Sequence, residues 1–137
     1  MRVLLADDQL NVRSALRLLL EQETDFQVVG ETADATGLLL AVAEKAADLV
    51  LLDWELPGLP AEQLVRLLQF ERPYLKIIAM SSRPEVEALV KAAGVQANLS
   101  KGDSPERVLA IIRAHLPSQS NLSTKLSGAN SCKQNRI

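Results

Sequence analysis

Side chains that could do chemistry stand directly after short apolar runs of this sequence. Three of them are carboxylates, one is a hydroxyl and one is an ammonium, at Asp7, Asp8, Asp53, Ser81 and Lys101. If the fold brings these positions together, the carboxylates repel: two unit charges about 5 Å apart cost about 3 kcal/mol at an effective dielectric constant of 20. Such a cluster persists when a divalent cation or the lysine neutralises it, or when one carboxyl group stays protonated.

The donor set favours Mg²⁺ over softer metals. Hard carboxylate oxygens in an incomplete protein shell suit this ion, which keeps several waters and accepts phosphate oxygens as ligands. The ammonium of Lys101 would then suit an anion rather than the metal. A carboxylate nucleophile, a metal ion and a cation together indicate phosphoryl transfer onto an aspartate.

Each of these residues also has a simpler interpretation when it is considered alone. Asp7 and Asp8 could be the acids expected at the start of any helix. Asp53 could be a turn residue, Ser81 the N-cap of a helix, and Lys101 a solvated charge. Only their combination favours a site.

Five short apolar runs predict strands, over residues 2–6, 26–30, 48–52, 75–80 and 96–100. Helical spacing of apolar residues predicts five helices, over residues 10–21, 34–47, 61–71, 85–93 and from 105 onward. Strands that alternate with helices form a parallel sheet with helices on both faces. Ligands of such α/β sheets gather beyond the carboxyl ends of the strands, where the polar residues above are found.

The helix over residues 61–71 is expected to turn four apolar side chains inward: Leu64, Val65, Leu67 and Leu68. Pro84 is expected to open the next helix and Gly94 to end it. Trp54 follows Asp53 directly, and we expect it to point outward beside the site.

Composition restricts the class of protein. The chain has 137 residues, 47% of them apolar, and a net charge of −2, which suits one domain and argues against a broad basic surface for nucleic acid. The single cysteine, Cys132, cannot form an intrachain disulfide, and no apolar run is long enough to span a membrane. We therefore expect a compact cytoplasmic domain.

The chain is expected to divide near residue 116. Residues 1–116 carry 12 basic and 17 acidic side chains (net −5), whereas residues 117–137 carry three basic side chains and no acid (net +3). The second segment is rich in Ser, Asn and Gln, with too few apolar residues to offset the entropy of ordering it. Residues 117–137 are therefore predicted to be a polar linker or tail.

Four stretches together resemble the receiver domain of bacterial two-component response regulators. They are Val-Leu-Leu-Ala-Asp-Asp at 3–8, Asp-Leu-Val-Leu-Leu-Asp at 48–53 followed by Leu-Pro-Gly at 56–58, Ala-Met-Ser-Ser at 79–82, and Leu-Ser-Lys-Gly-Asp at 99–103. The resemblance covers residues 2–116. Because no proline follows Lys101, the sequence is more similar to the NarL/LuxR-type branch of the family than to the OmpR-type branch. It implies a flavodoxin-like (CheY-like) doubly wound sheet of five parallel strands in the order 2-1-3-4-5.

The resemblance also implies a role for each polar residue. Asp53 resembles the phosphoacceptor, Ser81 the switch hydroxyl that turns toward the phosphoryl group, and Lys101 the cation that pairs with it. The implied Mg²⁺ ligands are Asp8, Asp53 and the backbone carbonyl of Glu55, with Asp7 acting through water. Receivers often have an aromatic residue three positions before the lysine, where this chain has Asn98, so the coupling of Ser81 to the surface is expected to differ.

The implied partner is a sensor histidine kinase that donates the phosphoryl group from a phosphohistidine. Weak homodimerisation through residues 84–115 is a further expectation, while DNA binding by this chain itself and membrane association are not expected. An output domain for transcription would lie beyond Ile137. The alternative is a stand-alone or phosphorylation-independent interaction module. No enzyme activity is expected beyond self-directed phosphotransfer and slow autodephosphorylation.

Overall fold

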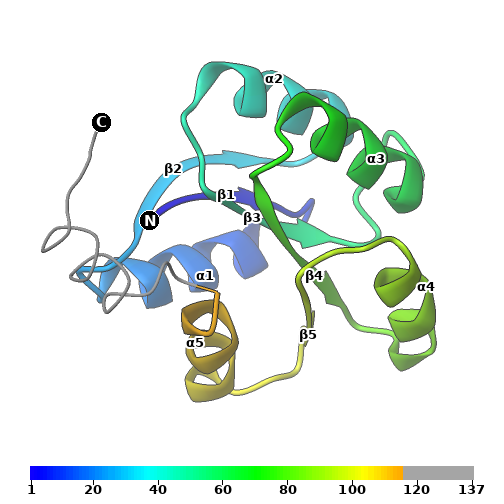
Figure 1. The fold of residues 1–137 in the computed structure, drawn as a ribbon. Coiled ribbons are helices and arrows are strands. Elements are labelled where there is room, and N and C mark those ends of the chain that lie inside the picture. Colours follow the sequence, from blue (N-terminus) through cyan, green and yellow to red (C-terminus); the bar gives the residue numbers. More distant parts are fainter. Residues whose placement is uncertain (116–137) are drawn as a thin grey trace, which may run out of the picture.

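A computed structural model describes residues 1–115 and has a five-stranded parallel sheet at its centre (Figure 1). The strand order is β2-β1-β3-β4-β5, which confirms the predicted doubly wound topology. The strands are β1 (Arg2–Ala6), β2 (Gln27–Thr32), β3 (Leu49–Asp53), β4 (Lys76–Ser81) and β5 (Ala97–Ser100). The order reverses at β1 and β3, so ligands of this sheet are expected beyond the carboxyl ends of these two strands. The predicted tail over residues 117–137, with Cys132, lies outside the described residues.

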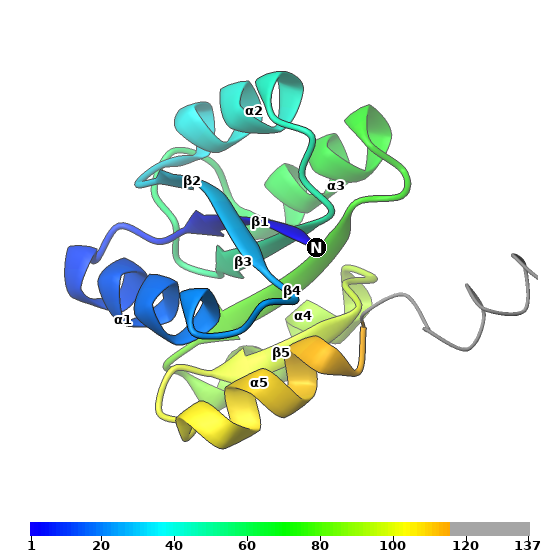
Figure 2. The same cartoon turned by 90° about the vertical axis from the view of Figure 1, so that its left-hand side faces the viewer.

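Five α-helices cover the sheet on both faces, as predicted (Figures 1 and 2). They are α1 (Leu10–Glu21), α2 (Ala35–Glu44), α3 (Ala61–Glu71), α4 (Glu87–Ala92) and α5 (Pro105–Arg113). Helices α1 and α5 pack on one face of the sheet, and α2, α3 and α4 pack on the other. None of the helices within residues 1–115 is long and apolar enough to cross a membrane.

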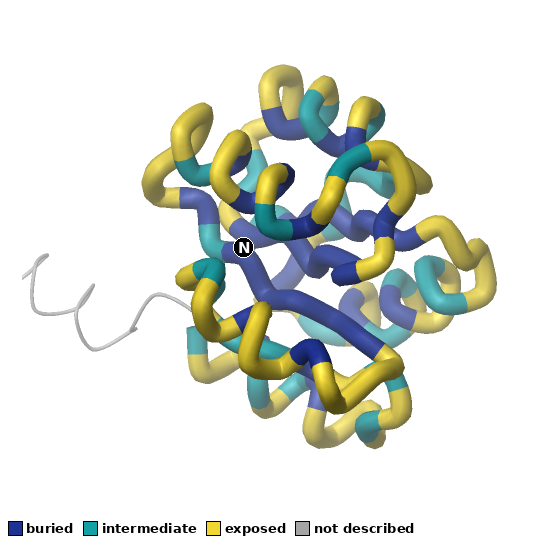
Figure 3. Tube along the Cα trace, turned by 90° about the vertical axis from the view of Figure 1, so that its right-hand side faces the viewer, coloured by how far each residue is buried: buried dark blue, intermediate teal, exposed yellow. Residues whose placement is uncertain are grey.

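The alternation of side chains along the strands divides the core in two. In β3, Val50 and Leu52 point toward α2, α3 and α4, whereas Leu49 and Leu51 point toward α1 and α5. All four are fully buried, because a parallel sheet covered on both faces leaves neither set in water. Figure 3 shows the resulting run of buried residues through the centre of the molecule. This apolar double layer fixes where the carboxyl ends of the strands lie.

The bounds predicted for the helix over residues 85–93 are wrong. A 3₁₀ turn, Pro84–Val86, comes first and the α-helix begins only at Glu87. The Arg83 side chain does not cap this turn, and Pro84 supplies no N–H, so a tighter turn starts the helix. Gly94 follows the helix with a φ of 80°, in agreement with its predicted role as the stop.

Trp54 does not point outward as expected. Its side chain is buried, at 6% exposed, and packs in the core between the sheet and helices α2, α3 and α4. The reason is the period of two along β3, which places Trp54 on the same face as Leu52. The backbone N–H of Trp54 donates to the carbonyl of Met80 at 2.8 Å, which extends the pairing of β3 with β4. The hydrogen bonding between the two strands therefore continues one residue beyond the end of β3.

Leu67 is the other misplaced apolar side chain. Leu64, Val65 and Leu68 are fully buried on α3 as predicted, but Leu67 is 41% exposed. Three inward residues already fill the stripe that the helix presents to the sheet, and Leu67 lies beyond its edge.

We expect Leu64→Ala to lower the free energy of unfolding by about 2–5 kcal/mol, because it leaves a cavity in the core. Leu67→Ala, the same change on the same helix, is expected to cost less than about 1 kcal/mol because its side chain already contacts water. Urea unfolding of both variants measures the difference. Equal losses would contradict the observed orientation of α3.

Candidate functional site

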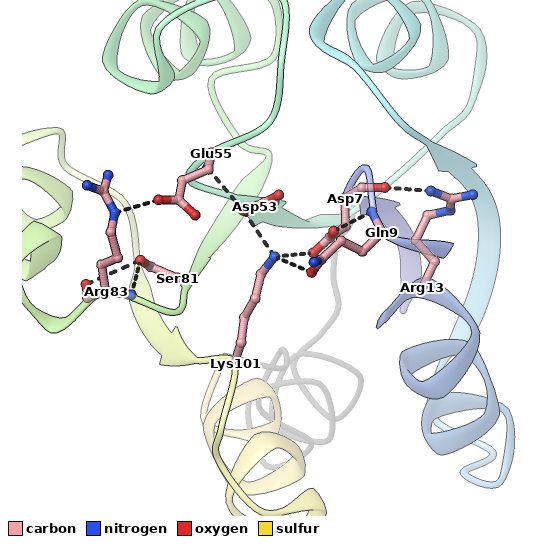
Figure 4. Close-up of polar contacts among 8 residues, drawn as sticks. All are labelled: Asp7, Gln9, Arg13, Asp53, Glu55, Ser81, Arg83 and Lys101. Atoms are coloured by element: carbon pink, nitrogen blue, oxygen red, sulfur yellow. Dashed lines mark hydrogen bonds and ion pairs between the residues drawn. The ribbon is translucent and has the colours of Figure 1, made fainter. Parts of the chain in front are cut away.

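The polar residues predicted from the strand ends converge at the carboxyl edge of the sheet (Figure 4). Asp7 follows β1, Asp53 ends β3, Ser81 ends β4 and Lys101 follows β5. Backbone hydrogen bonds hold these ends together: the N–H of Lys101 donates to the carbonyl of Ser81 at 3.0 Å. The sheet register thus places residues that are up to 94 positions apart in the sequence around one site (from 7 to 101).

Lys101 is the centre of the site. Its Nζ lies 2.8 Å from Oδ2 of Asp7 and 3.3 Å from Oδ1 of Asp53. A third partner, Oε1 of Gln9, accepts a hydrogen bond from the same Nζ at 3.4 Å. The lysine therefore neutralises two carboxylates whose side chains are almost completely buried, at 0% and 2% exposed.

Each buried carboxylate also accepts a hydrogen bond from a backbone N–H group. The N–H of Gln9 donates to Oδ1 of Asp7 at 2.8 Å, and the N–H of Glu55 donates to Oδ1 of Asp53 at 3.0 Å. Each acid thus binds the backbone two residues further on, as Asx turns do. These bonds fix both side chains toward Lys101.

The titration of the site reflects burial opposed by pairing. Burial raises the pKa of Asp53, the Glu55 N–H lowers it, and the neighbouring Asp7 carboxylate raises it further, with a net pKa above the ordinary value. Burial lowers the pKa of Lys101, but its contacts with Asp7 and Asp53 outweigh burial and raise the net pKa. Lys101 is therefore held in its charged form.

Three carboxylates offer oxygens to a cation at one point. Ligand atoms of Asp7, Asp8 and Asp53 all lie within 4.8 Å of one another, and Asp8 is the exposed member of the three. Asp8 and Asp53 border an open pocket of about 370 Å³, whose lining also includes Gln9, Val12, Glu55, Ser82 and Lys101. Oδ2 of the buried Asp7 makes no aligned hydrogen bond within residues 1–115, although it lies near the lysine. Hard oxygens with room for water fit Mg²⁺.

Ser81 lies at this edge but does not face the other residues of the site. Its Oγ accepts from the N–H of Arg83 at 2.9 Å and contacts the carbonyl of Arg83 at 3.2 Å. The neighbouring Ser82, rather than Ser81, lines the pocket. In Figure 4 Ser81 belongs with Arg83 and Glu55, on the side away from Asp7.

Several residues of the site were not predicted from the sequence. Arg13 of α1 donates from one guanidinium nitrogen to the carbonyl of Asp7 at 2.6 Å, and its Nε contacts Glu31 of β2 at 2.9 Å. Arg17 contacts the other oxygen of Glu31 at 2.5 Å. The four-residue spacing of the two arginines, which places them on one side of α1, was a signal that a common acid could lie between them.

Comparison with known families agrees with this geometry. The family description that matches the chain is the response regulator receiver domain, over residues 3–113. The chain belongs to this family. Its relatives are response regulators of the NarL/LuxR type, as the motifs predicted.

Curated relatives are longer than this receiver. The chain is 33% identical over 114 residues to the response regulator UvrY of Escherichia coli K12, covering 82% of this chain and 52% of that protein. It is 32% identical over 130 residues to the transcriptional regulatory protein LiaR of Bacillus subtilis, covering 93% and 61%. The chain spans about half the length of the curated relatives that it matches.

Solved structures share the fold. The receiver is similar to RcsB from Salmonella enterica serovar Typhimurium bound to promoter rprA in the presence of the phosphomimetic BeF₃⁻, with a TM-score of 0.78 and 25% identity over 82% of this chain and 66% of that chain. A CheY-like receiver domain protein from Methanospirillum hungatei gives a TM-score of 0.74 at 25% identity, over 82% and 90% of the two chains.

We expect Glu31→Gln to lower the free energy of unfolding by about 0.5–1 kcal/mol at pH 7. The hydrogen bond from Arg17, and less strongly that from Arg13, lowers the pKa of Glu31 against the opposing effect of burial. A lowered pKa stabilises the fold fully above the unfolded value near 4.5, and this contribution fades as the pH falls through the folded pKa.

Urea unfolding between pH 7 and pH 3 measures this difference. The gap between the receiver and Glu31→Gln should close toward acid pH, whereas the control Glu44→Gln, an exposed acid on α2, should show little gap throughout. A gap that stays constant or widens as the pH falls contradicts the assigned pairing.

Proposed function

We propose that this receiver accepts a phosphoryl group on Asp53 in a Mg²⁺-dependent reaction. The observation that carries the proposal is the buried Asp53 carboxylate, which shares Lys101 with Asp7 at the base of an open pocket. Within that pocket Asp8, Asp53 and the backbone carbonyl of Glu55 would hold the metal, and Asp7 would act through water. Bound Mg²⁺ would neutralise charge on the phosphoryl oxygens.

The chain's own contribution would be position and charge. An oxygen of Asp53 attacks phosphorus, the bond from phosphorus to the donor imidazole breaks, and the imidazole leaves with the electron pair. The N–H of Glu55 keeps Asp53 oriented, and Lys101 exchanges its carboxylate contact for a phosphoryl oxygen. No general base is needed when Asp53 attacks as a carboxylate, because an ionised oxygen has no proton to remove. We therefore regard the protein as a substrate of phosphotransfer rather than an enzyme with turnover.

A sensor histidine kinase is the donor that we propose, since the family receives phosphate from phosphohistidine. The added charge on Asp53 would change a partner-binding face of the receiver. The similar RcsB structure is described as bound to a promoter, and the curated relatives include transcriptional regulators. We infer that this receiver takes part in the control of transcription through a separate output domain and does not itself bind DNA.

Incubation of the full chain with Mg²⁺ and acetyl phosphate should give a single phosphoryl adduct by intact mass. The adduct should be absent in Asp53→Asn and strongly reduced in Asp8→Asn or with EDTA. Asp25→Asn, an exposed acid before β2 at the edge of the sheet opposite the site, serves as the matched control and should react like the unaltered chain.

An adduct that persists in Asp53→Asn would contradict the assigned acceptor. Absence of any adduct with several donors would favour a phosphorylation-independent interaction module instead.

We further propose weak homodimerisation of the phosphorylated form through residues 84–115. Leu89 on α4 is 49% exposed there, next to the short edge strand β5. Sedimentation should show a larger mean mass with Mg²⁺ and BeF₃⁻ than without, and Leu89→Gln should reduce the change. Identical sedimentation in both states would contradict this proposal.

A further inference from the structure

The side of the site that carries Ser81 contains an ion pair between two loops. Nε of Arg83, after β4, lies 2.5 Å from Oε2 of Glu55, after β3. Both side chains are partly exposed, at 52% and 38%, and Glu55 also lines the pocket. Figure 4 shows this pair directly beside the hydrogen bonds between Arg83 and Ser81.

The backbone of the same Arg83 also binds the hydroxyl of Ser81. Its N–H donates to Oγ at 2.9 Å, and its carbonyl lies within hydrogen-bond distance of that hydroxyl at 3.2 Å. Ser81 is 5% exposed, so its hydroxyl has little access to water as an alternative partner. To reach a group on Asp53, Ser81 must give up both contacts, which leaves the N–H of Arg83 in need of a new partner.

We propose that Glu55 and Arg83 are positioning residues that hold Ser81 away from Asp53. The side-chain ion pair ties the loop after β4 to the loop after β3, and the backbone of the tied residue holds the hydroxyl. Breaking the ion pair frees the loop to move and lowers the free energy needed to turn Ser81 toward a phosphoryl group. The proposal rests on Asp53 being the phosphoacceptor.

Affinity for BeF₃⁻ in the presence of Mg²⁺ tests this role, with Glu55→Gln and Arg83→Gln measured separately by calorimetry. A direct effect of charge on the bound anion has opposite sign in the two variants and largely cancels in their average. Release of Ser81 has the same sign in both. We therefore expect the averaged affinity, the geometric mean of the BeF₃⁻ affinities of the two variants, to be about two- to fivefold higher than the affinity of the unaltered chain. This is the range that an exposed ion pair supplies.

Two further variants complete the design. The exchange E55R with R83E restores the ion pair at unchanged net charge and should return hydrogen exchange at the amide of residue 83 to the rate of the unaltered chain. In a Ser81→Ala background, Arg83→Gln and Glu55→Gln should no longer raise the averaged affinity, because the hydroxyl that they release is gone. An averaged affinity equal to that of the unaltered chain, or a gain that persists in Ser81→Ala, overturns the proposal.

Hydrogen exchange at the amide of residue 83 tests the restraint without any ligand. In Glu55→Gln this amide, which donates to Ser81, should exchange about two- to fivefold faster than in the unaltered chain. Unchanged exchange overturns the role of the ion pair even if Asp53 is modified. Faster exchange in a chain that never binds BeF₃⁻ would instead support the restraint and count against the proposed phosphoacceptor.

Discussion

Two carboxylates buried at one edge of the sheet require a cation, and Lys101 supplies it. Asp7 and Asp53 are almost without access to water, so leaving both charged and unpaired would cost several kcal/mol. The ammonium reaches both because β5 pairs with β4, β4 with β3 and β3 with β1. The arrangement of the strands and the electrostatics of the site are therefore one constraint, since a shift of any strand end would separate the lysine from an acid.

The site has two polar parts that differ in burial. On one side, Asp7, Asp53 and Lys101 are held by backbone N–H groups and by one another in a nearly water-free setting. On the other, Glu55 and Arg83 meet in partly exposed loops, where an ion pair is weak and easily rearranged. The buried part would suit the acceptor of the proposed phosphotransfer, and the exposed part would suit a response to it.

Helix α1 joins this edge of the sheet to the neighbouring strand. Arg13 reaches from α1 to the carbonyl of Asp7 and to Glu31 of β2, where Arg17 also binds. The first carboxylate of the site thus has its backbone carbonyl held by a side chain, in addition to its own turn. The restraint lies outside the pocket, so it supports the position of Asp7 without occupying the space open to a ligand.

The spacing of apolar residues predicted the fold, and the positions of the polar residues at the strand ends predicted the candidate site. Apolar runs of five or six residues that alternate with amphipathic helices are typical of a covered parallel sheet, which made the architecture and the strand-end positions of Asp7, Asp53, Ser81 and Lys101 predictable. Tertiary structure decided the rest: Ser81 bound to the backbone of Arg83, and Glu31 shared by two arginines. These outcomes depend on side-chain rotations and on pairs distant in sequence, whose small energy differences are set by neighbours that no local pattern contains.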